Sequence, residues 1–210
     1  MNAQTKKFLI DGPVGKIEVA VDMPADAPRG MALVAHPHPL FGGTMDNKVA
    51  VTLARTLVQL GYVVYRSNFR GVGATQGEHD NGVGERDDLM AVIEHMRADP
   101  DPEHGTLPLV LAGFSFGTVV LSHVAARLRD AGVAIERIVF VGTAASRWDV
   151  APVPENTLVI HSELDETVPI GSVFEWARPQ ELPVVVVPGA EHFLHRKLHI
   201  LKRIVTEAWR

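Results

Sequence analysis

The sequence predicts an α/β protein with an eight-stranded, mostly parallel sheet and helices on both faces. Short segments rich in β-branched residues recur along the chain. From the third onward they are continuously apolar, which is typical of strands buried on both faces of a parallel sheet. Segments with helical periodicity separate the later ones, as in doubly wound sheets. With 210 residues, no internal repeat and no linker, we expect one domain, residues 1–210.

Each element is expected from its local pattern. The predicted strands are a weaker one at 6–10, followed by 16–21, 31–36, 62–69, 107–113, 137–142, 157–162 and 183–188. Helices are expected where apolar residues repeat at intervals of three and four, near 49–60, 89–96, 120–128 and 198–205. Because ligands bind beyond the carboxyl ends of the strands in such sheets, residues that directly follow a strand are the first candidates for a functional site.

Composition argues against several classes of function. A net charge of −5 and an isoelectric point near 6.0 give no electrostatic reason for binding nucleic acid or an anionic membrane. The chain has no cysteine, which excludes disulfides, thiolate metal sites and cysteine nucleophiles. The apolar run at 8–10 is too short for a signal peptide, and polar residues interrupt the longest apolar stretch, 107–128. We expect a cytoplasmic protein with no nucleic-acid or membrane partner.

The segment Gly113-Phe114-Ser115-Phe116-Gly117 has the pattern G-x-S-x-G between a predicted strand and a predicted helix. In that context the pattern marks a nucleophilic serine at a sharp turn. The small residues on either side let strand and helix approach, and the N-terminus of the helix favours negative charge. A chance match is the alternative, but the flanking elements favour Ser115 as the nucleophile.

A serine hydroxyl needs a base to take its proton, and histidine is the usual one. His192 lies on a short loop between the last predicted strand and the last helix, and His161, which ends a strand, is the weaker alternative. A carboxylate must then fix the tautomer of the histidine. Asp165 follows the seventh strand, with Glu163 as the alternative. The chain order Ser115, Asp165, His192 is the one expected on such a sheet.

These motifs resemble those of the α/β-hydrolase superfamily over essentially the whole chain. The resemblance rests on GFSFG at 113–117, HSELDETVP at 161–169 and PGAEHFLH at 188–195. The segment HPHPLFGGTMDN at 36–47 is similar to that of small bacterial hydrolases related to the dienelactone hydrolases. Dienelactone hydrolases themselves use a cysteine where this chain has Ser115. The resemblance implies a serine hydrolase that needs no cofactor.

The resemblance also implies an oxyanion hole made of two backbone N–H groups. One belongs to Phe116, the residue after the nucleophile, and the other to the loop after the third element of the sheet. Two prolines in that loop have no N–H to donate. Matching His38 and its proline to the His-Gly pair of such hydrolases makes Leu40 the donor, whereas matching His36 and its proline makes it His38. Leu40 is favoured here, with His38 as the alternative.

The connection at 142–156 is too short to form the cap domain that many α/β-hydrolases insert after the sixth strand. We therefore expect an open site with no cap. Three aromatic residues, Phe41, Trp148 and Phe193, are candidates for contact with the substrate. An open apolar rim of this kind predicts small acyl groups and weak discrimination.

The function that fits these residues best is hydrolysis of small carboxylic esters, small-molecule substrates, through an acyl-enzyme intermediate. A thioesterase or a small-peptide hydrolase would use the same residues, and a non-catalytic binding protein on the same fold is an alternative of another class. His36 and His38 have a spacing found in metal sites, but no third ligand lies at a diagnostic interval, so no metal is expected. A monomer or a homodimer is expected.

Overall fold

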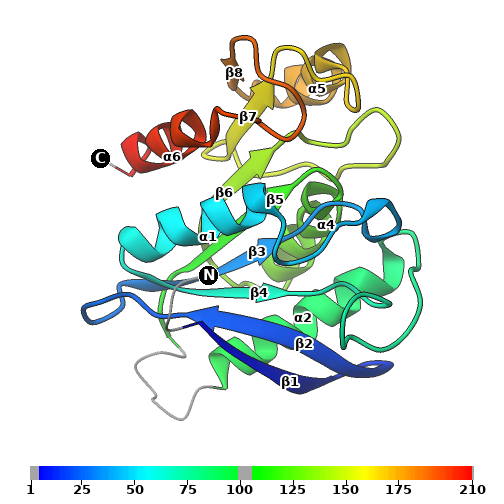
Figure 1. Ribbon diagram of the computed structural model, residues 1–210, viewed down its shortest axis with the longest axis vertical. Coiled ribbons are helices and arrows are strands. Elements are labelled where there is room, and N and C mark those ends of the chain that lie inside the picture. The colour runs from blue at the N-terminus through cyan, green and yellow to red at the C-terminus, as the bar shows by residue number, and fades with distance from the viewer. Residues whose placement is uncertain (1–4, 99–105, 210) are drawn as a thin grey trace.

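The computed structural model describes residues 5–98 and 106–209 and contains the predicted eight-stranded sheet (Figure 1). Its strands are β1 (Lys6–Gly12), β2 (Gly15–Asp22), β3 (Gly30–Ala35), β4 (Tyr62–Ser67), β5 (Leu109–Phe114), β6 (Ile135–Val141), β7 (Leu158–Ser162) and β8 (Val184–Val187). They lie in the order β1-β2-β4-β3-β5-β6-β7-β8. The pairings of β2 with β1 and β4 are antiparallel and the other described pairings are parallel, so the predicted mostly parallel sheet is confirmed.

The helices are α1 (Lys48–Gln59), α2 (Val83–Arg97), α4 (Phe116–Asp130), α5 (Ile170–Ala177) and α6 (Leu198–Glu207), with short 3₁₀ turns η1 (Pro39–Phe41) and η2 (Arg178–Gln180). Helix α5 is not predicted by the sequence. Only Val173 and Ala177 in it are buried, so its apolar pattern spans a single turn, and Gly171 and the aromatic residues in it are weak helix formers. None of the described helices has the length and apolar character needed to cross a bilayer.

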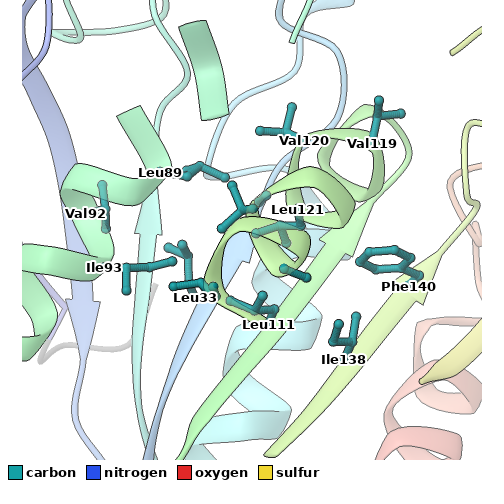
Figure 2. Packing of buried hydrophobic residues seen from close by; sticks show 14 of the residues in the cluster. Leu33, Leu89, Val92, Ile93, Leu111, Val119, Val120, Leu121, Ile138 and Phe140 are labelled. Carbon is teal, nitrogen blue, oxygen red and sulfur yellow. The ribbon is translucent and has the colours of Figure 1, made fainter. Parts of the chain in front are cut away.

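Two apolar layers hold the helices against the sheet. Figure 2 shows Leu33 of β3 and Leu111 of β5 gathered with side chains of α2 and α4 on one face of the sheet. Their neighbours along the strands, Val34 and Val110, belong to the cluster on the other face, where Leu53 of α1 packs together with α6. Because successive side chains of a strand point to opposite faces, strands covered on both sides must be apolar throughout. This is the origin of the continuous apolar runs.

A buried ion pair fixes the turn after β4 to helix α2. The guanidinium of Arg70 donates from Nε to Asp88 Oδ2 and from Nη2 to Asp88 Oδ1, each at 2.8 Å. Its Nη2 also donates to the carbonyl oxygen of Gly84 at 2.7 Å. The side chains of Arg70 and Asp88 are only 8% and 3% exposed, so the two charges depend on each other for solvation.

Parallel strands β3, β5, β6, β7 and β8 direct their carboxyl ends to one edge of the sheet. The loops that leave this edge include 36–47 after β3 and 142–157 after β6. The second of these contains no helix and forms no cap domain, as the sequence predicts. The site therefore lies at an edge that is not covered by an inserted domain.

Candidate active site

Ser115 lies at the turn between β5 and α4 with φ 54° and ψ −120°. A positive φ is strained for a residue other than glycine and persists only where the surroundings enforce it. Here the N–H of Ser115 donates to Val141 O of β6 at 2.9 Å. A Cβ on Gly117 would lie 2.5 Å from Ala35 O, and one on Gly113 would lie 2.9 Å from the carbonyl carbon of Gly117. The two glycines are therefore required because β3, β5 and α4 approach so closely.

Replacing Gly117 by alanine should lower the free energy of unfolding by about 1–3 kcal/mol, because the added methyl group meets backbone rather than a movable side chain. Turnover should fall as well, since the N-terminus of α4 must shift away from β3. Urea unfolding monitored by circular dichroism measures the first effect. Gly171→Ala in α5 is the matched control, because a Cβ there meets nothing within 4 Å, and it should change stability by less than about 1 kcal/mol. Equal effects of the two substitutions would contradict the close-approach argument.

The structure brings Ser115, His192 and Asp165 together. His192 follows β8, and its Nε2 lies 3.1 Å from Ser115 Oγ. Its Nδ1 lies 2.7 Å from Oδ2 of Asp165, which follows β7. A carboxylate can only accept, so Nδ1 carries a proton, and Nε2 of the neutral ring is free to accept the proton of the serine hydroxyl. Each of the three residues is 7% exposed, so water competes little for these hydrogen bonds.

The turn after β7 holds Asp165 in place. Asp165 Oδ1 accepts the N–H groups of Thr167 at 3.0 Å and Val168 at 2.8 Å, which leaves Oδ2 for His192. Nε2 of the buried His161 donates to Val168 O at 3.0 Å and lies 3.8 Å from Asp165 Oδ2. Burial lowers the pKa of His161, which favours its neutral form. His161 therefore braces the turn that holds Asp165.

The alternative acid, Glu163, has a different role. Its Oε2 accepts the N–H of Gly189 at 2.7 Å and links the turns that follow β7 and β8. Among the described contacts of Glu163 none is to His192. The structure therefore places Asp165 rather than Glu163 at the histidine.

The loop after β3 begins with His36, whose side chain is fully buried. Its Nδ1–H donates to Pro37 O at 2.6 Å, and its Nε2 accepts the N–H of Phe69 at 2.9 Å. Both ring nitrogens are thus used inside the protein, and they tie this loop to the segment after β4. Burial lowers the pKa of His36 to about 4, so the ring is neutral at neutral pH.

Acidification should therefore destabilise the protein between about pH 6.5 and pH 4. The pKa of His36 is about 4 in the folded state, against its usual 6.5, so the unfolded chain binds more protons in this range. Stability is then lost as the pH falls, by up to about 3 kcal/mol for this residue. Urea unfolding at a series of pH values tests this, with His36→Gln as the comparison. The variant should be less stable at pH 7 and lose less stability on acidification; an unchanged slope would show that His36 is not responsible.

The N–H groups of residues 40–43 all donate within the turn that contains η1. That of Leu40 reaches Nδ1 of His38 at 3.3 Å, and the Leu40 side chain is 71% exposed. This arrangement argues against Leu40 as an oxyanion donor, because the chain enters a 3₁₀ turn at Pro39 and directs the N–H of Leu40 back to the side chain of His38. The N–H groups of His38 and Phe116 have no acceptor among residues 5–98 and 106–209. The alternative matching of the loop, which names His38, is therefore favoured.

Two adjoining cavities meet at Ser115. The larger, of about 360 Å³, is lined by Pro37, His38, Phe41, Gly42, Gly43, Asn47, Ser115, Arg147, Thr167, His192 and Phe193. The smaller, of about 50 Å³, is lined by His38, Phe41, Ser115, Phe116, Ala144, Ser146, Arg147, Trp148, Thr167 and Val168. Of the aromatic residues expected to contact substrate, Phe41 lines both cavities, Trp148 only the smaller and Phe193 only the larger. Leu40 lines neither.

The imidazole of His38 is packed among other rings. Its centroid lies 4.7 Å from those of Phe116 and His79, 4.8 Å from that of Phe41 and 5.5 Å from that of Trp148. Burial lowers the pKa of His38, and the neighbouring His79 lowers it further. A neutral His38 ring is consistent with Nδ1 accepting the N–H of Leu40. The ring therefore supports both the turn and the wall of the site.

Sequence reasoning did not find Arg147 and Thr167, which line both cavities. The N–H of Thr167 also braces its turn by donating to Oδ1 of Asp165. Arg147 lies next to Trp148 in the loop after β6. Its position just beyond the carboxyl end of a strand is a signal that could have identified it.

Comparisons with known proteins agree with this geometry. The family model for "Serine aminopeptidase, S33" matches residues 42–181. A serine hydrolase without a lid from Xanthomonas campestris is 38% identical, with a TM-score of 0.88 over 99% of this chain and 94% of that chain. A serine hydrolase homologue from Coxiella burnetii is 37% identical, with a TM-score of 0.81 over 96% of each chain.

A dienelactone hydrolase from Anabaena variabilis shares the fold at 21% identity, with a TM-score of 0.73 over 98% of this chain and 97% of that chain. The predicted resemblance to the α/β-hydrolase superfamily is therefore confirmed, both in the family model and in the arrangement of the sheet. The chain belongs to the serine aminopeptidase S33 family, and it is a lidless α/β serine hydrolase.

Proposed function

We propose that the protein hydrolyses small carboxylic esters through an acyl-enzyme intermediate. The observation that carries this proposal is the pair of hydrogen bonds that joins Ser115 Oγ to His192 Nε2 at 3.1 Å and His192 Nδ1 to Asp165 Oδ2 at 2.7 Å. In this arrangement one nitrogen of the histidine can take the serine proton while the carboxylate stabilises the imidazolium that forms. Serine at the strained turn is thereby activated as a nucleophile.

The reaction proceeds in two steps. Ser115 Oγ attacks the carbonyl carbon of the ester, and His192 Nε2 takes the hydroxyl proton. When the tetrahedral intermediate collapses, the carbon–oxygen bond to the alcohol breaks and His192 gives the proton to the departing oxygen. Water then attacks the acyl carbon, gives a proton to His192, and the acid is released as Ser115 regains its hydroxyl proton.

The negative oxygen of the intermediate needs donors that are in place before the reaction. We assign this role to the backbone N–H groups of Phe116 and His38, since neither has an acceptor among the described residues and both residues line the smaller cavity beside Ser115. The N–H of Phe116 also lies at the first position of α4, where the helix dipole favours negative charge. One such donor typically contributes about 2.7–4 kcal/mol to lowering the barrier.

Hydrolysis of small peptides is the second candidate, because the matching family model is that of serine aminopeptidases. The same residues would act, with His192 protonating the departing amine. Turnover of 4-nitrophenyl acetate compared with that of an amino-acid 4-nitroanilide distinguishes the two. Faster turnover of the anilide would favour the peptidase.

Intact mass spectrometry after incubation with a fluorophosphonate tests whether Ser115 is activated. A single adduct is expected on the wild-type protein, because the activated hydroxyl displaces fluoride at phosphorus. No adduct should form on Ser115→Ala, and labelling of His192→Ala should be much slower. Absence of an adduct on folded wild-type protein would favour a non-catalytic binding protein instead.

A further inference from the structure

The two cavities at Ser115 differ in whether His192 lines them. His192 lines the cavity of about 360 Å³ but not the adjoining one of about 50 Å³. Because His192 must deliver its proton to the departing oxygen, the alcohol part of an ester has to lie on the side where His192 is exposed to the cavity. The larger cavity is therefore on the alcohol side of Ser115.

The smaller cavity adjoins Ser115 but is not lined by His192. It is lined by Ser115 and by both residues whose N–H groups have no acceptor, Phe116 and His38. An ester bound with its carbonyl oxygen toward these N–H groups and its alcohol toward His192 has its acyl chain directed away from His192. The smaller cavity, lined by Ser115, Phe116 and His38 but not by His192, fits this requirement.

We infer that the protein selects esters of short acyl chains, up to about four carbons, and accepts much larger alcohols. The inference rests on the proposed function and assigns the acyl group of the ester to the smaller cavity and the alcohol to the larger one. One water needs about 10–15 Å³ on this measure of volume, so a cavity of about 50 Å³ holds only a few non-hydrogen atoms. In the acylation step the bond from Ser115 Oγ to the acyl carbon forms over the smaller cavity. The carbon–oxygen bond that breaks releases the alcohol, with the proton from His192, into the larger one.

Rigid packing fixes the inner wall of the acyl cavity. Phe116, Ala144 and Val168 in this wall are 1%, 6% and 3% exposed, so they cannot move aside without disturbing the core. The N–H of Ala144 also lies 3.3 Å from Oγ1 of the buried Thr118. The outer wall is less buried and includes Trp148, which is partly buried and stands edge-on to Phe116 with 5.0 Å between ring centroids. Because Trp148 has the largest side chain of this outer wall, it is the specificity-determining residue that limits acyl length.

Two substrate series test on the wild-type protein which cavity takes the acyl group and which takes the alcohol. In the first, 4-nitrophenyl acetate, butanoate and octanoate vary the acyl chain with one leaving group, and kcat/KM should be at least about tenfold lower for octanoate than for butanoate. In the second, 4-nitrophenyl and 4-methylumbelliferyl acetates vary the alcohol, and kcat/KM should differ by less than about threefold. Tolerance of octanoate with rejection of the larger alcohol would overturn the inference and leave the esterase function standing. Absence of turnover in both series, together with no fluorophosphonate adduct, would overturn both.

Substitutions in the cavity walls test which residues limit the length of the acyl chain. Trp148→Ala should raise the ratio of octanoate to acetate kcat/KM at least about tenfold, because it removes the movable wall of the acyl cavity. Ala144→Leu should lower the ratio of butanoate to acetate by a similar factor. Phe193→Ala is the matched control, since Phe193 is an aromatic wall of the larger cavity and does not line the smaller one, and it should leave the acyl ratios unchanged within about twofold. If Phe193→Ala changed the acyl ratios as much as Trp148→Ala, the assignment of the cavities would be wrong.

Discussion

Replacing Asp165 by asparagine is expected to lower kcat for a small ester about 10⁴-fold while the protein stays folded. The amide oxygen of the new side chain can still accept the N–H groups of Thr167 and Val168, as Oδ1 of the aspartate does. Its amide nitrogen then faces His192 Nδ1, at the place where Oδ2 of the aspartate accepts a hydrogen bond from Nδ1–H with 2.7 Å between the two atoms. An amide donates at this position, so Nδ1 must accept and the proton moves to Nε2. A protonated Nε2 cannot take the proton of Ser115.

The measurement is steady-state turnover of 4-nitrophenyl acetate beside thermal unfolding of the same samples. Glu163→Gln is the matched control, because Glu163 is two residues away and its carboxylate has the N–H of Gly189 as its one described hydrogen-bond partner. It should retain kcat within about threefold. A similar loss in both variants, or a small loss in Asp165→Asn, would show that Asp165 does not set the tautomer of His192.

Replacing Asp88 by alanine is expected to lower the free energy of unfolding by about 3–5 kcal/mol. The Arg70 guanidinium would keep its bond to Gly84 O but lose both bonds to the carboxylate, and it would remain as a buried charge without its counter-ion. The cost comes from this unpaired charge more than from the lost attraction. The double substitution Arg70→Leu and Asp88→Leu should recover part of the loss, because it removes both charges together.

Urea unfolding at pH 7 measures this loss. Asp87→Ala provides the control on the same helix, since Asp87 pairs with Arg127 at the surface, where the side chains are 49% and 46% exposed. An exposed pair of this kind contributes at most about 1 kcal/mol. If Asp88→Ala and Asp87→Ala were equally stable, the buried Arg70 would not need Asp88 as its counter-ion, and the argument from burial would be wrong.

The sequence predicts well those parts of the fold in which burial requires a distinct pattern of apolar residues. Most of the strands could be predicted because strands covered on both faces must be apolar throughout, as Leu33 and Val34 of β3 illustrate. Ser115, Asp165 and His192 could be expected to lie together because each follows a strand closely, and parallel strands bring their carboxyl ends to one edge. Helix α5 was missed because only Val173 and Ala177 of it reach the core.

The oxyanion donor in the loop after β3 could not be identified from the sequence in the same way. Its two prolines narrow the choice of donors but leave the register of the turn open, and both Leu40 and His38 satisfy the sequence pattern. The decision depends on the 3₁₀ turn, in which the N–H of Leu40 points to Nδ1 of His38 at 3.3 Å. The two cavities are likewise tertiary features, since their walls come from loops that are far apart in the sequence.

The connection between β6 and β7 separates substrate selection from catalysis, two properties that often constrain each other in enzymes. Bond making and breaking is assigned to Ser115, Asp165 and His192, which follow β5, β7 and β8; Ser115 is anchored to β6 by its backbone N–H and Asp165 to its own turn by two N–H groups. Trp148 and Arg147, by contrast, lie in the middle of a helix-free loop, between the core residues Ala144 and Val150. Substitutions at residues 146–149 can therefore alter which substrates the protein accepts while Ala144 and Val150 keep the loop anchored to the core. A lineage built on this scaffold can acquire new substrates by changing these four residues.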